Sequence, residues 1–80
     1  MARLVFLGRL EDLAGAPERD VFLAGPAPLS DILATLPADL AAALVAPRVR
    51  LAVNGTLAAP DGLTVSPDDE LAFLPPVSGG

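Results

Sequence analysis

Short apolar runs, separated by glycine, proline and polar turns, recur along this chain of 80 residues. Residues 2–7 are one such run, and residues 18–24 (ERDVFLA) end in another. Both segments are typical of β-strands. Between them, Leu10 and Leu13 share a helical face, but the glycine and proline that follow limit this segment to one helical turn at most. The first part of the chain therefore predicts two strands that pair as a hairpin with a long connection.

From residue 29 the apolar positions follow the spacing of a helix. The positions that share one helical face are Leu29, Ile32, Leu33 and Leu36. Pro37 ends or kinks this helix, because proline lacks an amide hydrogen and clashes with the preceding turn. Residues 38–46 continue as a second short helical piece, so the middle of the chain predicts one main helical region.

The second half of the chain predicts three more strands. Asn54 and Gly55 stand between apolar residues, and this pair is typical of a two-residue hairpin turn because both positions require a positive φ. A further turn is predicted at residues 66–69, which combine serine, proline and aspartates. Residues 70–74 (ELAFL) then form the last strand.

These elements favour an α+β fold. Two hairpins separated by a helix indicate a mixed sheet of about five strands, with the one main helix packed on one face. The first and last strands then become parallel neighbours at the centre of the sheet, which is the ubiquitin-like β-grasp layout. We expect residues 1–74 to form this domain. Residues 75–80 are expected to form an extended C-terminal tail that protrudes from the domain and ends in Gly-Gly.

The residue types that the sequence lacks exclude several kinds of site. Cysteine and histidine do not occur, and all five basic residues are arginines. Disulfides, thiol nucleophiles, the usual zinc sites and the commonest general base are therefore excluded. We expect no metal site and a chain that is not catalytic alone.

Net charge and hydropathy exclude some classes of binding partner. The net charge of −5 and the isoelectric point near 4.2 argue against nucleic acids and anionic membranes. The longest fully apolar run, residues 40–46, is far shorter than the roughly 18 residues that indicate a membrane span. We expect a cytoplasmic protein that binds neither nucleic acid nor membranes.

The last residues, LPPVSGG, predict a reactive tail. Pro75 and Pro76 cannot donate to a sheet and favour an extended path, so the six residues from Pro75 reach about 20 Å at most. Gly79 and Gly80 lack a Cβ atom and fit a channel too narrow for other residues. The carboxylate of Gly80 can attack the α-phosphate of ATP, and a sulfur nucleophile or a lysine amine can then attack the acyl-adenylate. The predicted chemistry is carboxyl activation, performed by other proteins.

The tail and the residues before it resemble the small subunit of molybdopterin synthase, the MoaD family of sulfur carriers. DDELAFLPPVSGG carries this resemblance most specifically, and LAVNGTL and LVFLGRLEDLAG support it. The likeness covers most of the chain. The sequence departs from the family at Leu74, where an aromatic residue is frequent, and at Asp68, where glycine is common.

The resemblance implies that an ATP-dependent activating enzyme (MoeB-like, similar to E1 enzymes) adenylates Gly80, which then becomes a thiocarboxylate. In the large synthase subunit (MoaE-like), sulfur would pass to a cyclic pyranopterin precursor and form the molybdopterin dithiolene. Two small and two large subunits usually form a heterotetramer. The residues expected in the channel of the large subunit are Pro75, Pro76, Val77, Ser78 and Gly79. Phe73 and Leu74 are a possible docking surface, and no cofactor is expected on the carrier itself, since the activating enzyme uses the ATP.

Three alternatives remain open at this point. One is a sulfur carrier for thiazole (thiamine) or cysteine biosynthesis, although thiazole carriers as a group lack the pair of prolines. Another is a ubiquitin-like modifier that forms isopeptide bonds with other proteins. The third is a β-grasp binding module in which Gly80 has no role.

Several other residues have simpler interpretations. Residues 68–70 are acidic and could form a metal or acid/base cluster, but a solvated turn is favoured. Phe6 and Phe22 are predicted to lie in the core. Arg48 and Arg50 are interpreted as strand-edge residues that promote solubility, and no site is assigned to them.

Overall fold

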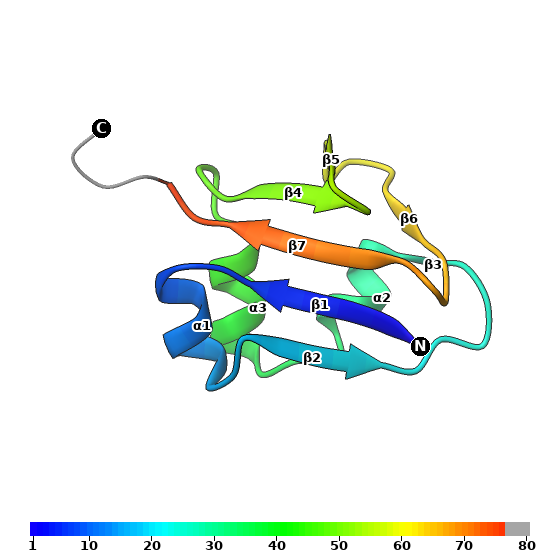
Figure 1. Cartoon of the computed structure of the whole chain (residues 1–80), viewed down its shortest axis with the longest axis horizontal. Coiled ribbons are helices and arrows are strands. Elements are labelled where there is room, and N and C mark those ends of the chain that lie inside the picture. The colour runs from blue at the N-terminus through cyan, green and yellow to red at the C-terminus, as the bar shows by residue number, and fades with distance from the viewer. Residues whose placement is uncertain (77–80) are drawn as a thin grey trace.

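The computed structural model describes residues 1–76. The strands are β1 (Ala2–Phe6), β2 (Glu18–Val21), β3 (Ala27–Pro28), β4 (Arg50–Val53), β5 (Thr56–Ala58), β6 (Thr64–Val65) and β7 (Glu70–Leu74). The helices are α1 (Arg9–Ala14), α2 (Leu29–Leu33) and α3 (Ala38–Leu44). Figure 1 shows these elements with the main sheet face on.

The main sheet has five strands in the order β2-β1-β7-β4-β5. The central pair, β1 and β7, is parallel, whereas β1–β2, β4–β7 and β4–β5 are antiparallel. The first and last strands of the chain are therefore neighbours at the centre of a mixed sheet, as the sequence predicts. The α+β, ubiquitin-like β-grasp fold is confirmed.

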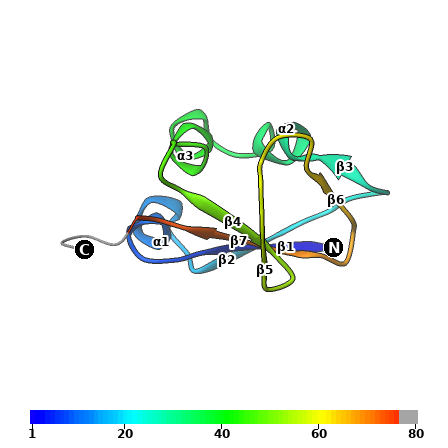
Figure 2. The ribbon, with the colours of Figure 1, turned by 90° about the horizontal axis from the view of Figure 1, so that it is seen from above.

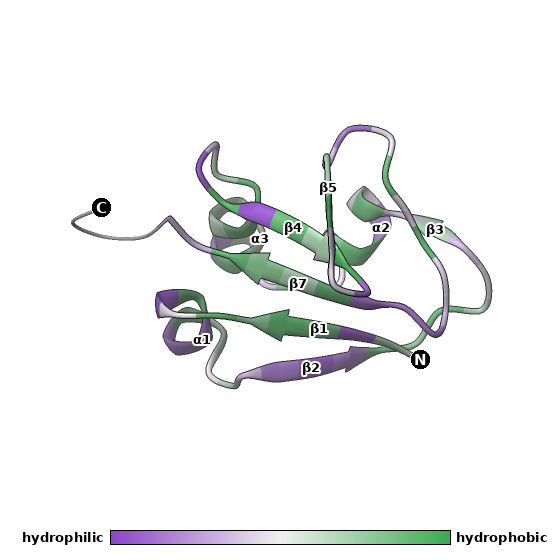
Figure 3. Ribbon diagram, turned by 45° about the horizontal axis from the view of Figure 1, so that its top comes forward, coloured by the Kyte–Doolittle hydropathy of each residue, from purple (hydrophilic) through white to green (hydrophobic). Residues whose placement is uncertain are grey.

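Helices α2 and α3 cover one face of this sheet, and α1 lies at the end where β1 and β7 finish (Figures 1 and 2). Successive residues of a strand point to opposite faces, so alternate residues of the two central strands enter the core between sheet and helices. These are Leu4 and Phe6 in β1, and Leu71 and Phe73 in β7, each at most 1% exposed. The hydropathy pattern in Figure 3 agrees, because the central strands are mostly hydrophobic and the edge strand β2 is hydrophilic.

The helical region consists of two separate helices and not of the one main helix that the sequence predicts. Helix α2 ends at Leu33, and the Oγ1 atom of Thr35 donates a hydrogen bond to the carbonyl of Ile32 at 2.7 Å. Helix α3 then begins directly after Pro37. The break at Pro37 is thus confirmed, and it turns the region into two separate short helices.

Three features differ from the sequence prediction. Helix α1 spans six residues and exceeds a single turn. Strands β3 and β6 form a small second sheet of two residues each, which periodicity cannot detect in so short a segment. The third difference concerns Phe22, which was predicted to lie in the core and is 73% exposed. Strand β2 ends at Val21, whose side chain is buried, so the alternation of side chains turns Phe22 toward solvent.

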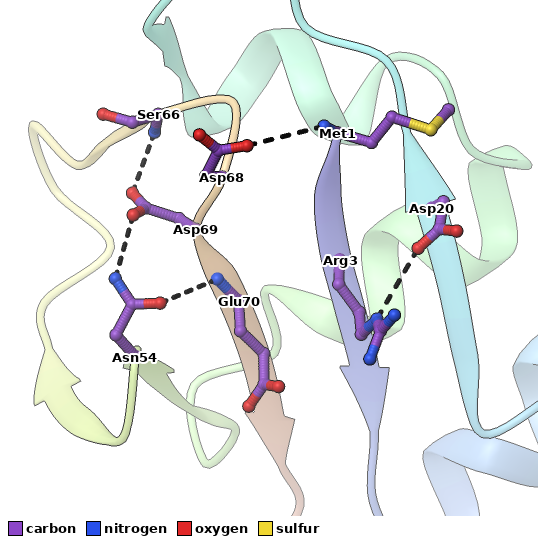
Figure 4. A network of polar contacts seen from close by, with 8 residues as sticks. All are labelled: Met1, Arg3, Asp20, Asn54, Ser66, Asp68, Asp69 and Glu70. Carbon is purple, nitrogen blue, oxygen red and sulfur yellow. Dashed lines mark hydrogen bonds and ion pairs between the residues drawn. The ribbon is translucent and has the colours of Figure 1, made fainter.

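A polar network joins the hairpin turn of β4 and β5 to the turn before β7 (Figure 4). Asn54 and Gly55 both have positive φ, 51° and 84°, as the predicted turn requires. The side-chain amide of Asn54 donates to a carboxylate oxygen of Asp69 at 2.9 Å and accepts from the backbone N–H of Glu70 at 2.9 Å. The second oxygen of Asp69 accepts from the N–H of Ser66 at 2.8 Å. Asn54 therefore determines a turn and also holds the entrance to the last strand.

We predict that Asn54→Ala lowers the free energy of unfolding by more than Asn54→Gly does. Both variants lose the side-chain hydrogen bonds, at a net cost of about 1–2 kcal/mol. Only alanine adds the strain of a left-handed backbone, about 1 kcal/mol more. Urea unfolding of the three proteins measures both steps. Equal stability of the wild type and Asn54→Gly would show that the network does not stabilise the fold.

Candidate functional site

The candidate site is the point where the chain leaves the sheet. Strand β7 ends at Leu74, which pairs with Arg50 of β4, and the carbonyl of Phe73 accepts a hydrogen bond from the N–H of Leu7 at 3.2 Å. Strands on both sides therefore fix the backbone up to Leu74. Pro75 and Pro76 follow at once and are half-buried. We call these two prolines the tail root.

The ring of Pro75 packs on the turn between β1 and α1. Gly8 occupies this turn with φ 56° and ψ −135°, a conformation that favours glycine. A Cβ atom at Gly8 would lie 3.0 Å from Cγ of Pro75, so a side chain there would push the proline ring aside by a few tenths of an ångström. The sequence analysis missed this role of Gly8. The only signal was a single glycine directly after the first apolar run.

Phe73 does not contribute to a docking surface. It is fully buried, and its ring stacks on that of Phe6 with centroids 5.9 Å apart and an angle of 13° between the planes. The expectation for Phe73 is wrong because alternation along β7 turns Leu71 and Phe73 inward. The same alternation turns Leu74 to the other face, where it is half-buried, and a docking role for Leu74 stays a prediction.

The other predicted tail residues are only partly within the structure. Pro75 and Pro76 lie at the end of β7, as expected. Val77, Ser78, Gly79 and Gly80 lie outside the described residues, and their roles stay predictions.

The acidic residues 68–70 lie in and beside a turn, where their contacts are within the fold. Asp69 accepts the two hydrogen bonds given above, and these lower its pKa, first through the Ser66 backbone and then through Asn54. Asp68 lies 3.9 Å from the N-terminal ammonium group and is fully exposed. Within residues 1–76 no group of three side chains could hold a metal ion. The interpretation as a turn agrees with these contacts.

Within residues 1–76, none of the helices combines the length and the apolar character that crossing a membrane requires. Arg3 lies 3.6 Å from both Glu18 and Asp20 on the neighbouring edge strand. These exposed pairs contribute little stability.

Comparison with known families identifies the kind of protein. The model of the ThiS family matches residues 4–80, nearly the whole chain and the Gly-Gly end with it. The chain belongs to the ThiS family. This match confirms the coarser prediction, a small ubiquitin-like protein of a sulfur-carrier and modifier family, and does not decide the finer assignment to molybdopterin synthase.

Two crystal structures of an archaeal protein are similar to this member of the ThiS family. A crystal structure of SAMP1 from Haloferax volcanii is 28% identical, with a TM-score of 0.77, and covers 99% of this chain and 98% of its own. A crystal structure of small archaeal modifier protein 1 from H. volcanii is 27% identical, with a TM-score of 0.74 and coverage of 95% and 97%. No curated protein sequence matches the chain.

The lowered pKa of Asp69 predicts a pH-dependent stability of this ThiS-family domain. The folded-state pKa lies below the unfolded value of about 3.9, so the stabilisation is present above that pH and is lost as the pH falls through the folded-state pKa. Urea unfolding between about pH 6 and pH 2 should therefore show a steeper loss for the wild type than for Asp69→Asn. Asp61→Asn, in an exposed turn, is the control with the same change of charge. A loss that is equally steep in Asp69→Asn would contradict the assignment.

The contact between Gly8 and Pro75 predicts coupling between two substitutions. Gly8→Ala should lower the free energy of unfolding by about 1–3 kcal/mol, because of backbone strain and the close approach to Pro75. In a Pro75→Ala background the strain remains but the crowding is relieved. The cost of Gly8→Ala should then fall by about 0.5 kcal/mol or more. An unchanged cost would show that the proline ring does not pack on this turn.

Proposed function

We propose that this protein is a sulfur carrier whose Gly80 carboxylate is activated by an ATP-dependent, E1-like enzyme. The observation that carries the proposal is the extent of the ThiS-family match, which includes the Gly-Gly end. The position of Pro75 and Pro76, directly after a central strand, supports it. A rigid root followed by residues with small side chains suits a tail that enters an enzyme.

The chemistry takes place at one carboxylate. An oxygen of Gly80 attacks the α-phosphate of ATP, pyrophosphate leaves, and an acyl-adenylate forms. A hydrosulfide equivalent then attacks the carbonyl carbon and AMP leaves, so that a thiocarboxylate remains on Gly80. The enzyme supplies the ATP site and the acid/base groups, and the carrier supplies the carboxylate and a surface for recognition.

The finer proposal is the small subunit of molybdopterin synthase. The Pro-Pro-Val-Ser-Gly-Gly end supports it, because this spacer resembles that of the MoaD family. In this role Pro75 to Gly79 would lie in a channel of a MoaE-like large subunit, and a MoeB-like enzyme would activate Gly80. Sulfur would then pass to a cyclic pyranopterin precursor, and carrier and large subunit would assemble as a heterotetramer. A cytoplasmic location suits these steps.

A second candidate is a ubiquitin-like protein modifier. This candidate is favoured by the similarity to the Haloferax protein, whose name describes a modifier. The similarity extends over nearly the whole length of both chains. In this role a lysine amine of a target protein attacks the carbonyl carbon of the Gly80 adenylate, AMP leaves with loss of a proton from the amine, and an isopeptide bond forms. The first step is shared with sulfur transfer, and only the second nucleophile differs.

The intact mass of the protein tests the proposal. After incubation with ATP, sulfide and the host's purified activating enzyme, the mass should increase by the difference between one sulfur and one oxygen atom. Fragment ions should place the change at Gly80, and a Gly80 deletion should abolish it. The same spectrum measures whether the mature chain ends at this residue.

Controls separate the candidates. Omission of sulfide should leave the adenylate, detected as release of pyrophosphate, without the gain in mass. Lysine-linked conjugates in host cells, lost with Gly80, would favour the modifier. Dithiolene formation from the pyranopterin precursor, after a large subunit is added, would support the finer assignment. An unchanged mass, with an enzyme that is active on another carrier, would refute the sulfur-carrier proposal.

A further inference from the structure

Three of the five arginines gather around the tail root. Arg9 begins α1, Arg48 lies in the loop between α3 and β4, and Arg50 begins β4. Each of them lines a groove that also includes Pro76. Figure 1 shows why residues so distant in sequence meet here, since α1, this loop and the end of β7 lie at one end of the sheet. We call these three residues the arginine collar.

The collar has the opposite charge to the rest of the molecule. The whole chain has a net charge of −5, whereas the grooves around the tail root contain the three arginines and a single acidic residue, Asp12. Within residues 1–76 no ion pair involves the collar, while Arg3 on the edge of the sheet has two acidic neighbours. The guanidinium groups of the collar are therefore available to acidic groups of another molecule.

An apolar groove adjoins the collar. It has a volume of about 580 Å³ and lies between α1, α3 and the two prolines, and Arg9 and Arg48 of the collar also line it. Its lining is mostly apolar: Leu10, Leu13, Ala43, Ala46, Val49, Pro75 and Pro76. Leu13 is 47% exposed and remains available for contact. A groove of this kind accepts one or two apolar side chains.

The length of the tail determines what faces this surface. Four residues separate Pro76 from the carboxylate of Gly80 and span at most about 14 Å. An enzyme that holds Gly80 in its active site must therefore bring the mouth of its channel to the tail root. In the proposed function that enzyme is the activating enzyme, and its mouth meets the collar and the groove together.

We propose that the collar and the apolar groove are the recognition surface for the activating enzyme, whose channel mouth presents acidic side chains and an apolar anchor. This proposal rests on the proposed function. The carboxylates of the enzyme pair with Arg9, Arg48 and Arg50, and the anchor inserts between α1 and α3. The charges of the collar speed association and select the partner, and the apolar contact in the groove slows dissociation.

Single charge reversals test the collar. Arg9→Glu and Arg48→Glu should each raise the KM for the carrier in pyrophosphate release by about tenfold and leave kcat unchanged. Arg19→Glu is the matched control, because Arg19 is exposed on β2, lines none of these grooves and gives the same change of net charge. Its effect on KM should stay below about twofold. Added salt should raise the KM of the wild type more than that of Arg48→Glu.

The groove has its own pair of variants. Leu13→Ser should raise the KM several-fold, whereas Phe22→Ser, at an even more exposed apolar side chain outside the groove, should not. Far-ultraviolet circular dichroism and urea unfolding verify that all variants fold.

The outcomes distinguish the two proposals. If the wild type gains the thiocarboxylate and the collar variants match Arg19→Glu, the recognition surface is refuted and the proposed function stands. If the wild type is not activated, both are refuted. Sedimentation of the carrier alone tests whether a second copy of this chain occupies the collar and groove. Self-association that Arg48→Glu abolishes would overturn the assignment of this surface to the activating enzyme.

Discussion

The parallel pairing of β1 with β7 is the interaction on which the rest of the structure depends. It brings Leu4 beside Leu71 and Phe6 beside Phe73, so the two ends of the chain close a single core. The stacked rings of Phe6 and Phe73 add a contact worth about 0.5–1.5 kcal/mol beyond their buried area. Without this pair the two hairpins would be separate, and neither hairpin alone is stable in water.

The same pairing determines where the tail leaves the sheet. Because β7 lies between β1 and β4, its last residues are held from both sides, and the chain becomes free of the sheet only at Pro75. Two prolines then restrict the backbone further, and Gly8 provides the space that the first of them needs. The direction in which the chain leaves the domain is therefore a property of the core, and a partner meets it largely preorganised.

The β-grasp fold could be predicted because its signals are local and strong. The Asn54-Gly55 turn and the alternation in residues 70–74 determine two strands without knowledge of the rest. Alternation over residues 70–74, whose bounds the sequence predicts correctly, could have placed Phe73 in the core beside Leu71. For Phe22 the phase of the alternation depends on where β2 ends. The position of Phe22 thus required the end of β2 at Val21, which sequence patterns locate only approximately. The roles of Gly8 and the arginine collar depend on segments that meet only in space, and no local pattern reveals them.

In the proposed function, sulfur transfer and protein modification share one acyl-adenylate and differ only in the nucleophile that follows. The activating enzyme must therefore recognise the carrier chiefly at this first step. One surface at the tail root can serve both sulfur transfer and protein modification. The sequence has no lysine, so a lysine amine that attacks the adenylate must come from another molecule. A positive collar on an acidic carrier suits this arrangement. Its charge orients the tail root toward an acidic channel mouth, while the like charge of the remaining surface disfavours every other orientation.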